Sequence, residues 1–157
     1  MSQFFSKSWA DDVRAAIEAG PDEAARAAKL AEYWDFYAFV RNSYAASWAL
    51  GVRDLPAVYG GGSPAYLLVA WSGGQVSDCR IVGPDDPLEA TYVLAGDYAD
   101  WVALLSGYDA QRTVMYRKLL LEEGDLLEFF KGIYFFVESV ACLASVSTEL
   151  ATEPVPA

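Results

Sequence analysis

The side chains available for chemistry are few. The chain has 157 residues and no histidine, so it offers no imidazole acid or base, no histidine-activated nucleophile and no histidine metal ligand. Its cysteines, Cys79 and Cys142, form neither a metal-binding pair nor a disulfide framework and are typical of small buried apolar residues in a reducing compartment. Any chemistry would have to rest on carboxylates, Tyr, Lys or Arg. We predict no cofactor, no metal and no catalytic residue.

Glu138 is the acid whose position suggests catalysis, because it lies within an otherwise apolar stretch near the C-terminus. Helical spacing, however, places it on a narrow stripe that is mostly polar. The stripe consists of Glu128, Lys131, Phe135, Glu138, Cys142, Ser145 and Glu149. We therefore expect Glu138 to face solvent, and we expect Lys131 and Arg117 to be surface cations, with Lys131 three residues from Glu128 and able to pair with it.

Charge and hydropathy exclude several classes of partner. The formal net charge is −11 and the few Lys and Arg residues are scattered, so no basic stripe is present to bind nucleic acid. The apolar run between residues 131 and 149 is shorter than the roughly 20 residues that span a bilayer, and it contains Glu138, so stable membrane insertion is not expected. The first residues show no export signal, which predicts a cytoplasmic protein.

Periodicity and turn residues predict the elements. Helices are expected at 6–19, from Pro21 to about Asn42 with 34–40 readable as a strand instead, at 97–106, at 109–113 and from Gly124 onward. Strands are expected at 47–53, 64–71, 75–82, 89–95 and 116–123. This order predicts an α+β fold with a five-stranded, mainly antiparallel sheet covered on one face by helices. A single domain over 1–150 and a frayed tail over 151–157 follow.

The last helix has apolar side chains over most of its circumference, more than contact with a sheet alone would cover. Two interpretations are open. In the first, the aromatic second helix covers the remainder and closes the core. In the second, the last helix forms one wall of a cavity for an apolar ligand.

Four segments together resemble the sterol carrier protein type 2 family: the helix "FFSKSWADDVRAAI", the hairpin "YLLVAWSGGQVSDCRIV", the block from residue 90 to 125, and the hydrophobic closing helix. The block is the most specific, because a strand leads into a Tyr-x-x-Trp helix, then a Gly turn, a Met, a Lys-Leu pair and a Gly-Asp. The matching residues are Tyr98, Trp101, Gly107, Met115, Lys118, Leu119, Gly124 and Asp125.

The chain departs from this family pattern at two places. Arg117 stands where the family commonly has Gly, and the spacing from Met115 to Gly124-Asp125 is one residue longer. The extra residue predicts a bulge or a shifted register in the fifth strand.

The resemblance implies a sheet covered by helices, with an apolar tunnel walled by the C-terminal helix, in a lipid-binding type of domain. Its members bind sterols, fatty acids, acyl-CoA or other lipids, usually without catalysis. We therefore expect a hydrophobic small molecule as partner, with Tyr134, Tyr116 or Ser139 orienting its polar head. Carried over by position, the implied lining is Trp101, Leu104, Leu105, Met115, Leu119, Leu121, Phe129, Phe130, Ile133, Tyr134 and Val137.

Two other functions are compatible with the sequence. The first is a cavity-based enzyme, an isomerase or cyclase for a hydrophobic metabolite, which would need an acid or base such as Glu138 inside the cavity. The second is an interaction module or homodimer, in which Phe135 and the tryptophans are exposed on the surface.

Overall fold

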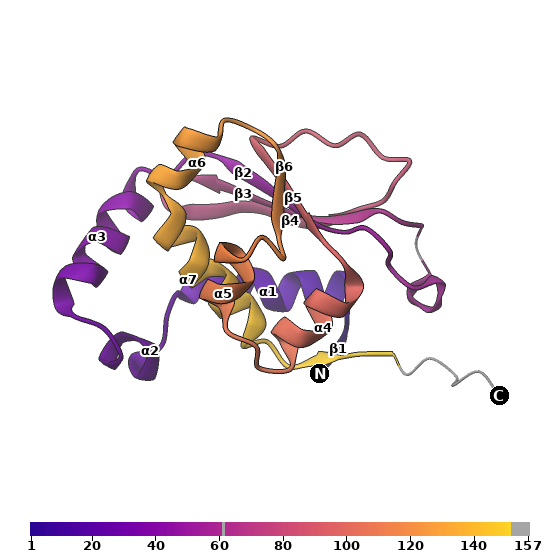
Figure 1. Ribbon diagram of the computed structural model, residues 1–157, viewed down its shortest axis with the longest axis horizontal. Coiled ribbons are helices and arrows are strands. Elements are labelled where there is room, and N and C mark those ends of the chain that lie inside the picture. The colour runs from indigo at the N-terminus through magenta and orange to yellow at the C-terminus, as the bar shows by residue number, and fades with distance from the viewer. Residues whose placement is uncertain (61, 152–157) are drawn as a thin grey trace.

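The computed structural model describes residues 1–60 and 62–151. Its centre is a five-stranded sheet with the order β4-β3-β2-β5-β6 (Figure 1). The strands are β2 (Ser47–Val52), β3 (Ala65–Ser72), β4 (Gln75–Val82), β5 (Tyr92–Gly96) and β6 (Leu120–Glu123). All neighbouring strands are antiparallel except β2 and β5, which run parallel. The predicted α+β class and the mainly antiparallel sheet are confirmed.

Helices lie together on one face of this sheet, as Figure 1 shows. They are α1 (Lys7–Ala19), α2 (Glu23–Ala27), α3 (Ala31–Asn42), α4 (Tyr98–Leu105), α5 (Ala110–Met115), α6 (Leu126–Lys131) and α7 (Ile133–Ala144), with a 3-10 turn η1 (Ala57–Tyr59). A separate pair of two-residue strands, β1 (Ser2–Gln3) and β7 (Thr148–Glu149), joins the two ends of the described chain in parallel. The sequence patterns did not indicate that pair.

Local signals explain where several elements begin and end. The Ser6 hydroxyl accepts a hydrogen bond from the Trp9 amide and caps α1, as Ser does at helix N-termini. Gly73 and Gly74, both at positive φ, make the two-residue turn between β3 and β4, a conformation that glycine adopts without strain. The Asp125 carboxylate accepts from the Leu127 and Glu128 amides and opens α6.

Three predicted elements differ from the observed ones. The helix expected from Pro21 to Asn42 is two helices separated at residues 28–30, and 34–40 is helical, so the alternative strand there was wrong. The last helix is interrupted at Gly132, a poor helix former that lies against Val40 and Tyr44. The strand expected at 116–123 begins only at Leu120. The tail predicted for 151–157 lies outside the described residues except for Ala151.

The core between sheet and helices is rich in aromatic side chains, and two groups of them are in ring contact. One group surrounds Phe4, with Phe5, Trp9 and Trp101 at centroid distances of 4.7 to 5.7 Å. The other surrounds Phe135, with Tyr44 and Trp71 at 4.8 and 4.9 Å. The first group links α1 to α4, and the second packs α7 on β3.

None of the helices in the described residues could cross a membrane. Each of them falls short of the length and apolar character that a bilayer crossing requires.

Candidate functional site

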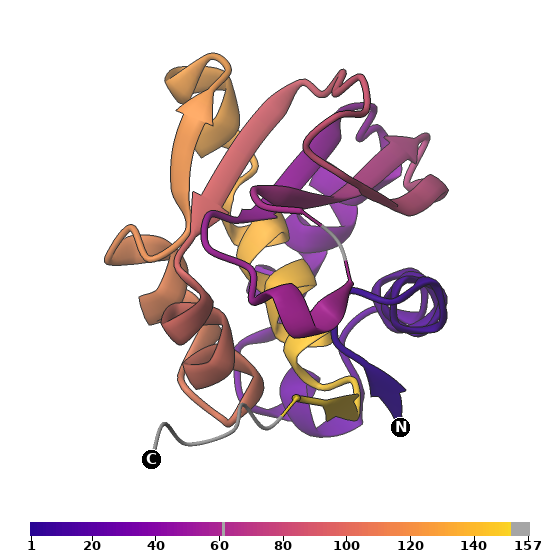
Figure 2. The ribbon, with the colours of Figure 1, turned by 90° about the vertical axis from the view of Figure 1, so that its right-hand side faces the viewer.

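An apolar cavity of about 350 Å³ opens where β6, α5 and α6 meet. These three elements gather at one side of the molecule, away from α1, in Figure 2. Ten of the eleven lining residues are apolar, and the eleventh is an arginine. They are Leu94, Val114, Met115, Arg117, Leu119, Leu120, Leu121, Leu126, Phe129, Phe130 and Ile133.

The lining divides into a floor and a rim by exposure. The floor is buried and consists of Leu94, Val114, Leu119, Phe129 and Ile133. The rim is partly open to solvent and includes Met115, Leu120, Leu126 and Phe130, with about half of the Leu126 and Phe130 side-chain surface exposed. Large apolar side chains exposed around a concave apolar site are typical of a ligand pocket.

The structure brings six of the predicted site residues together at this cavity: Met115, Leu119, Leu121, Phe129, Phe130 and Ile133. The other five lie elsewhere. Trp101 and Leu104 are buried in the core, where the Trp101 indole donates to the Gly51 carbonyl at 2.9 Å. Leu105 is half-buried on α4 and Val137 is buried on α7, while Tyr134 is exposed and packs against Tyr33. Their contact with a ligand stays a prediction.

None of the three side chains expected to orient a polar head lines this cavity. Ser139 is buried and donates to the Phe135 carbonyl at 2.9 Å. Tyr116 and Tyr134 are exposed and lie outside the lining.

Sequence reasoning missed five lining residues: Leu94, Val114, Arg117, Leu120 and Leu126. Leu94 could have been found from strand pairing, because it lies opposite Leu121 and paired residues share a sheet face. Val114 could not, because the predicted helix ended at 113. Leu120 lies within the predicted strand, but alternation along a strand places it on the face opposite to Leu119 and Leu121.

The strand opposite Leu94 contains the predicted bulge. Val93 pairs with Glu123 and Leu94 pairs with Leu121, so the register shifts and Glu122 is left between them. The prediction of an irregularity here is confirmed. The shift keeps Leu121 on the cavity side of β6 while Glu122 reaches Arg53, 3.7 Å away.

Arg117 has a backbone conformation that is unusual for its type. It follows the C-terminus of α5, where the Lys118 amide donates to the Thr113 carbonyl and the Arg117 amide to the Val114 carbonyl. This pair of bonds is the Schellman motif, whose left-handed position is normally glycine. Arg117 occupies that position with φ 60°. The left-handed conformation therefore explains why Gly is usual at this position in the family. This chain adopts the same conformation with an arginine.

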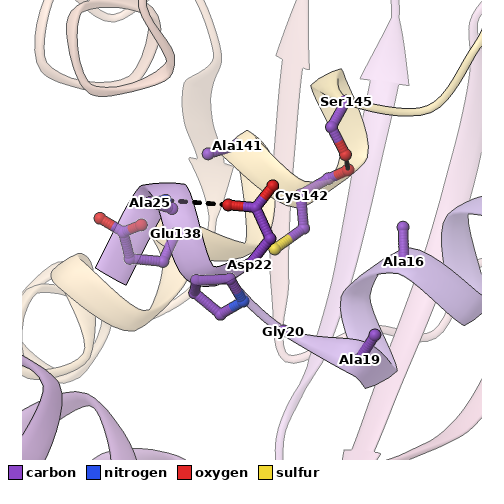
Figure 3. Close-up of a pocket in the computed structure, with 10 residues that line it drawn as sticks. Ala16, Ala19, Gly20, Asp22, Ala25, Glu138, Ala141, Cys142 and Ser145 are labelled. Carbon is purple, nitrogen blue, oxygen red and sulfur yellow. Dashed lines mark hydrogen bonds between the residues drawn. The ribbon is translucent and has the colours of Figure 1, made fainter. Parts of the chain in front are cut away.

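A second, more open cleft of about 280 Å³ lies between α1, α2 and α7 (Figure 3). Its walls are small residues, among them Ala16, Ala25 and Ala141, together with the carboxylates Asp22 and Glu138. Figure 3 shows the Asp22 carboxylate bonded to the Ala25 amide, the bond that caps α2.

Glu138 is buried, only 5% exposed, and the prediction that it faces solvent was wrong. The link between α2 and α3 passes over it, and Lys29 donates to its Oε1 at 2.6 Å while the Tyr33 hydroxyl donates at 2.7 Å. Burial, followed by this hydrogen bond, raises the pKa of Tyr33. The stripe was misassigned because Phe135 and Cys142, which share it, are buried rather than exposed to water. Phe135 packs against Tyr37 of α3, and Cys142 lines the cleft. Lys131 and Glu128 are exposed and paired at 2.8 Å, as predicted.

The two cysteines are buried and free, as the sequence indicates. Burial raises the pKa of the Cys142 thiol to about 11 and that of Cys79 to about 12. Cys79 donates weakly to the Ala10 carbonyl at 3.4 Å, which places α1 on β4. Both thiols therefore stay protonated at neutral pH.

Comparison with solved structures identifies the fold. A crystal structure of sterol carrier protein 2 superposes with a TM-score of 0.69 at 20% identity, covering 92% of this chain and all of the other. The chain has the sterol carrier protein 2 fold. A solution structure from Thermus thermophilus, described as possibly a sterol carrier protein, matches with a TM-score of 0.66 at 19% identity over 94% of this chain and 92% of that one. No protein-family model and no curated protein matches the sequence.

The sterol carrier protein 2 fold is the one that the sequence resemblance implied, and that prediction is confirmed. At about one identical residue in five, the agreement rests on the order and pairing of elements rather than on shared side chains.

Proposed function

We propose that this protein binds and carries a hydrophobic small molecule in the cavity between β6, α5 and α6, without catalysing a reaction. The observation that carries the proposal is the cavity's lining, which is apolar at ten of eleven positions. The fold, shared with a protein named as a sterol carrier, supports the same conclusion.

The size of the cavity favours a chain-like ligand over a bulky one. At roughly 30 Å³ per non-hydrogen atom, the share of one water in the liquid, 350 Å³ holds about a dozen atoms. This matches a medium-length hydrocarbon chain, whereas a sterol would extend well beyond the rim. About ten buried methylenes would contribute about 8 kcal/mol. Association costs subtract at least about 4 kcal/mol, so burial of the chain alone leaves at most about 4 kcal/mol, which corresponds to dissociation constants on the order of 1 mM or above.

The absence of catalysis is proposed because Arg117 is the one ionisable side chain in the cavity lining. Among its lining residues there is no carboxylate, tyrosine or lysine. Glu138, the acid considered for an isomerase or cyclase, is elsewhere and is held by Lys29 and Tyr33. Glu128 is paired with Lys131 at the surface.

The interaction surface considered from the sequence is not present in the described chain. Phe135 and all five tryptophans are buried, so the expectation that these side chains are exposed was wrong.

A cavity-filling variant tests the site against a matched control. Leu121 and Leu105 are both half-buried, but only Leu121 lines the cavity. Leu121→Trp should fill the space and abolish displacement of a fluorescent fatty acid by unlabelled ligands, while Leu105→Trp should leave displacement unchanged. Native mass spectrometry of the wild type should show the bound ligand directly.

Two outcomes of this experiment would change the proposal. Wild-type protein that neither displaces the probe nor retains a ligand refutes the proposal. Loss of binding in Leu105→Trp would move the site toward α4, which carries Trp101, Leu104 and Leu105. A thermal unfolding midpoint measured for each variant separates loss of binding from loss of folding.

A further inference from the structure

The cavity has one charged lining residue, and that residue is unpaired. Arg117 is exposed and belongs to the lining, so it lies at the opening. Within residues 1–60 and 62–151, its side chain makes no ion pair, although Lys118 beside it is paired with Asp100 at 3.3 Å and Arg53 is paired with Asp97 and Glu122. A cation at the rim of an apolar cavity is therefore available to a ligand.

The backbone conformation at position 117 disfavours an arginine, so its presence there calls for an explanation. The residue sits at φ 60°, a conformation that favours glycine at a helix C-terminus. Strained positions that persist cluster at ligand sites. Here the strain coincides with the only charge in the lining.

Resting on the function proposed above, we propose that the ligand is an anionic amphiphile: a medium-length hydrocarbon chain in the apolar cavity with a carboxylate head on the Arg117 guanidinium. Guanidinium groups bind carboxylates through two parallel hydrogen bonds. The floor, formed by residues such as Leu119, Phe129 and Ile133, accepts the chain, and the rim places its polar end beside Arg117.

Decanoate, with about a dozen non-hydrogen atoms, matches the cavity volume and provides the test. Binding is followed by NMR titration of leucine and isoleucine methyl groups, with 1-decanol and decyltrimethylammonium as neutral and cationic partners of the same chain length. The two ionic ligands are kept below the concentrations at which they form micelles, and 1-decanol is kept below its solubility limit. In the wild-type protein decanoate should bind about 10-fold more tightly than 1-decanol, and the cationic ligand most weakly.

Two variants assign the preference to Arg117. Arg117→Gly removes the charge and relieves the backbone conformation, so the variant should fold with an unchanged or higher thermal midpoint. Its affinity for decanoate should fall about 10-fold, to that of 1-decanol, whose own affinity should not change. Arg112→Gln is the matched control, because Arg112 is also exposed, forms no ion pair in the described chain and lies outside the cavity lining; decanoate binding should be unaffected.

The outcomes separate this inference from the function on which it rests. Equal binding of decanoate and 1-decanol, or an unchanged decanoate affinity in Arg117→Gly, overturns the anionic preference while leaving an apolar-ligand carrier in place. If Arg112→Gln loses as much decanoate affinity as Arg117→Gly, the effect comes from net charge, and the assignment to Arg117 is overturned. Failure of all three ligands to bind the wild type refutes both proposals.

Discussion

The two helices that end the fold, α6 and α7, are both mainly apolar, but their surroundings are opposite. In α7 nine of twelve residues are buried, including Phe135, Phe136 and Glu138. In α6 only Phe129 is buried, and Leu127, its most exposed large apolar residue, is 76% exposed. Gly132 separates the two helices.

The difference lies in what each helix packs against rather than in its own sequence. On one side of α7, Phe135 contacts Tyr37 and Tyr44 from the α3 region, and on another side Phe136 contacts Trp48 of the sheet. No such cover reaches α6 within the described residues, and it contacts the sheet through Phe129 and Tyr92 at 5.1 Å. Each interpretation of the last helix therefore holds for one part of it. Beyond Ile133, α7 closes the core, whereas α6 together with Ile133 forms a wall of the cavity.

The largest expected effect contrasts one phenylalanine from each helix. Phe136→Ala should lower the free energy of unfolding by about 3–5 kcal/mol, because it leaves a cavity among close-packed rings. Phe130→Ala on α6 should cost less than about 1 kcal/mol, since half of that side chain is already in water. Urea denaturation of both variants measures the difference, and equal losses would contradict the assignment of α6 as an open wall.

The ion pairs of the two helices give the next contrast. Lys29→Ala leaves the buried Glu138 carboxylate with the Tyr33 hydroxyl as its side-chain partner in the described chain and should cost about 2–3 kcal/mol. Lys131→Ala removes the partner of exposed Glu128 and should leave stability nearly unchanged, because water screens surface pairs. If the two variants unfold at the same urea concentration, the cover that α2 and α3 place over α7 contributes little.

The buried thiol of α7 predicts the response to alkali. The pKa of Cys142 is raised to about 11 from 9, so the folded state keeps its proton longer than the unfolded state does. The stabilising contribution is complete below pH 9 and is lost as the pH rises through 11, by roughly 2 kcal/mol. Between about pH 8 and pH 11, the free energy of unfolding measured in urea should therefore fall by roughly 2 kcal/mol less in Cys142→Ala than in the wild type. Parallel curves would indicate that alkali opens this helix before the thiol ionises.

The smallest expected effect is at the rim of the cavity wall. Arg117→Gly should raise the free energy of unfolding by about 0.5–1 kcal/mol. This gain is the strain that is relieved in the left-handed conformation minus the cost of the extra entropy that glycine gives the unfolded chain. Arg117→Ala should bring no such gain, because alanine retains the strain. Thermal midpoints measured without ligand resolve the two, and a destabilised Arg117→Gly would show that the arginine supports the fold directly.

The fold was largely predictable from sequence because its signals are local. Ser6, Gly73-Gly74 and Asp125 mark element ends through hydrogen bonds or backbone conformations within a few residues, and alternating strands set the sheet faces. The interruption at Gly132 was less visible, because one glycine in a strongly apolar helix is often tolerated.

The site was only partly predictable because it depends on neighbours far along the chain. Nothing near Glu138 in sequence indicates that Lys29 would cover it, since that contact joins residues 109 positions apart. The anomaly at Arg117 was visible as a departure from glycine, but its place at the cavity depends on where α5 ends relative to β6. The cytoplasmic location and the homodimer stay predictions.

The pairing of β1 with β7 places Ser2 beside Thr148, and the Trp9 indole donates to the Thr148 hydroxyl at 3.0 Å. Such a contact closes a loop of nearly the whole described chain, and loop closure costs entropy. During synthesis the first strand must wait for the last one to leave the ribosome. The strands of the sheet lie between residues 47 and 123 and can pair before then. We therefore expect the contact between β1 and β7 to form last and to stabilise a sheet that is already folded.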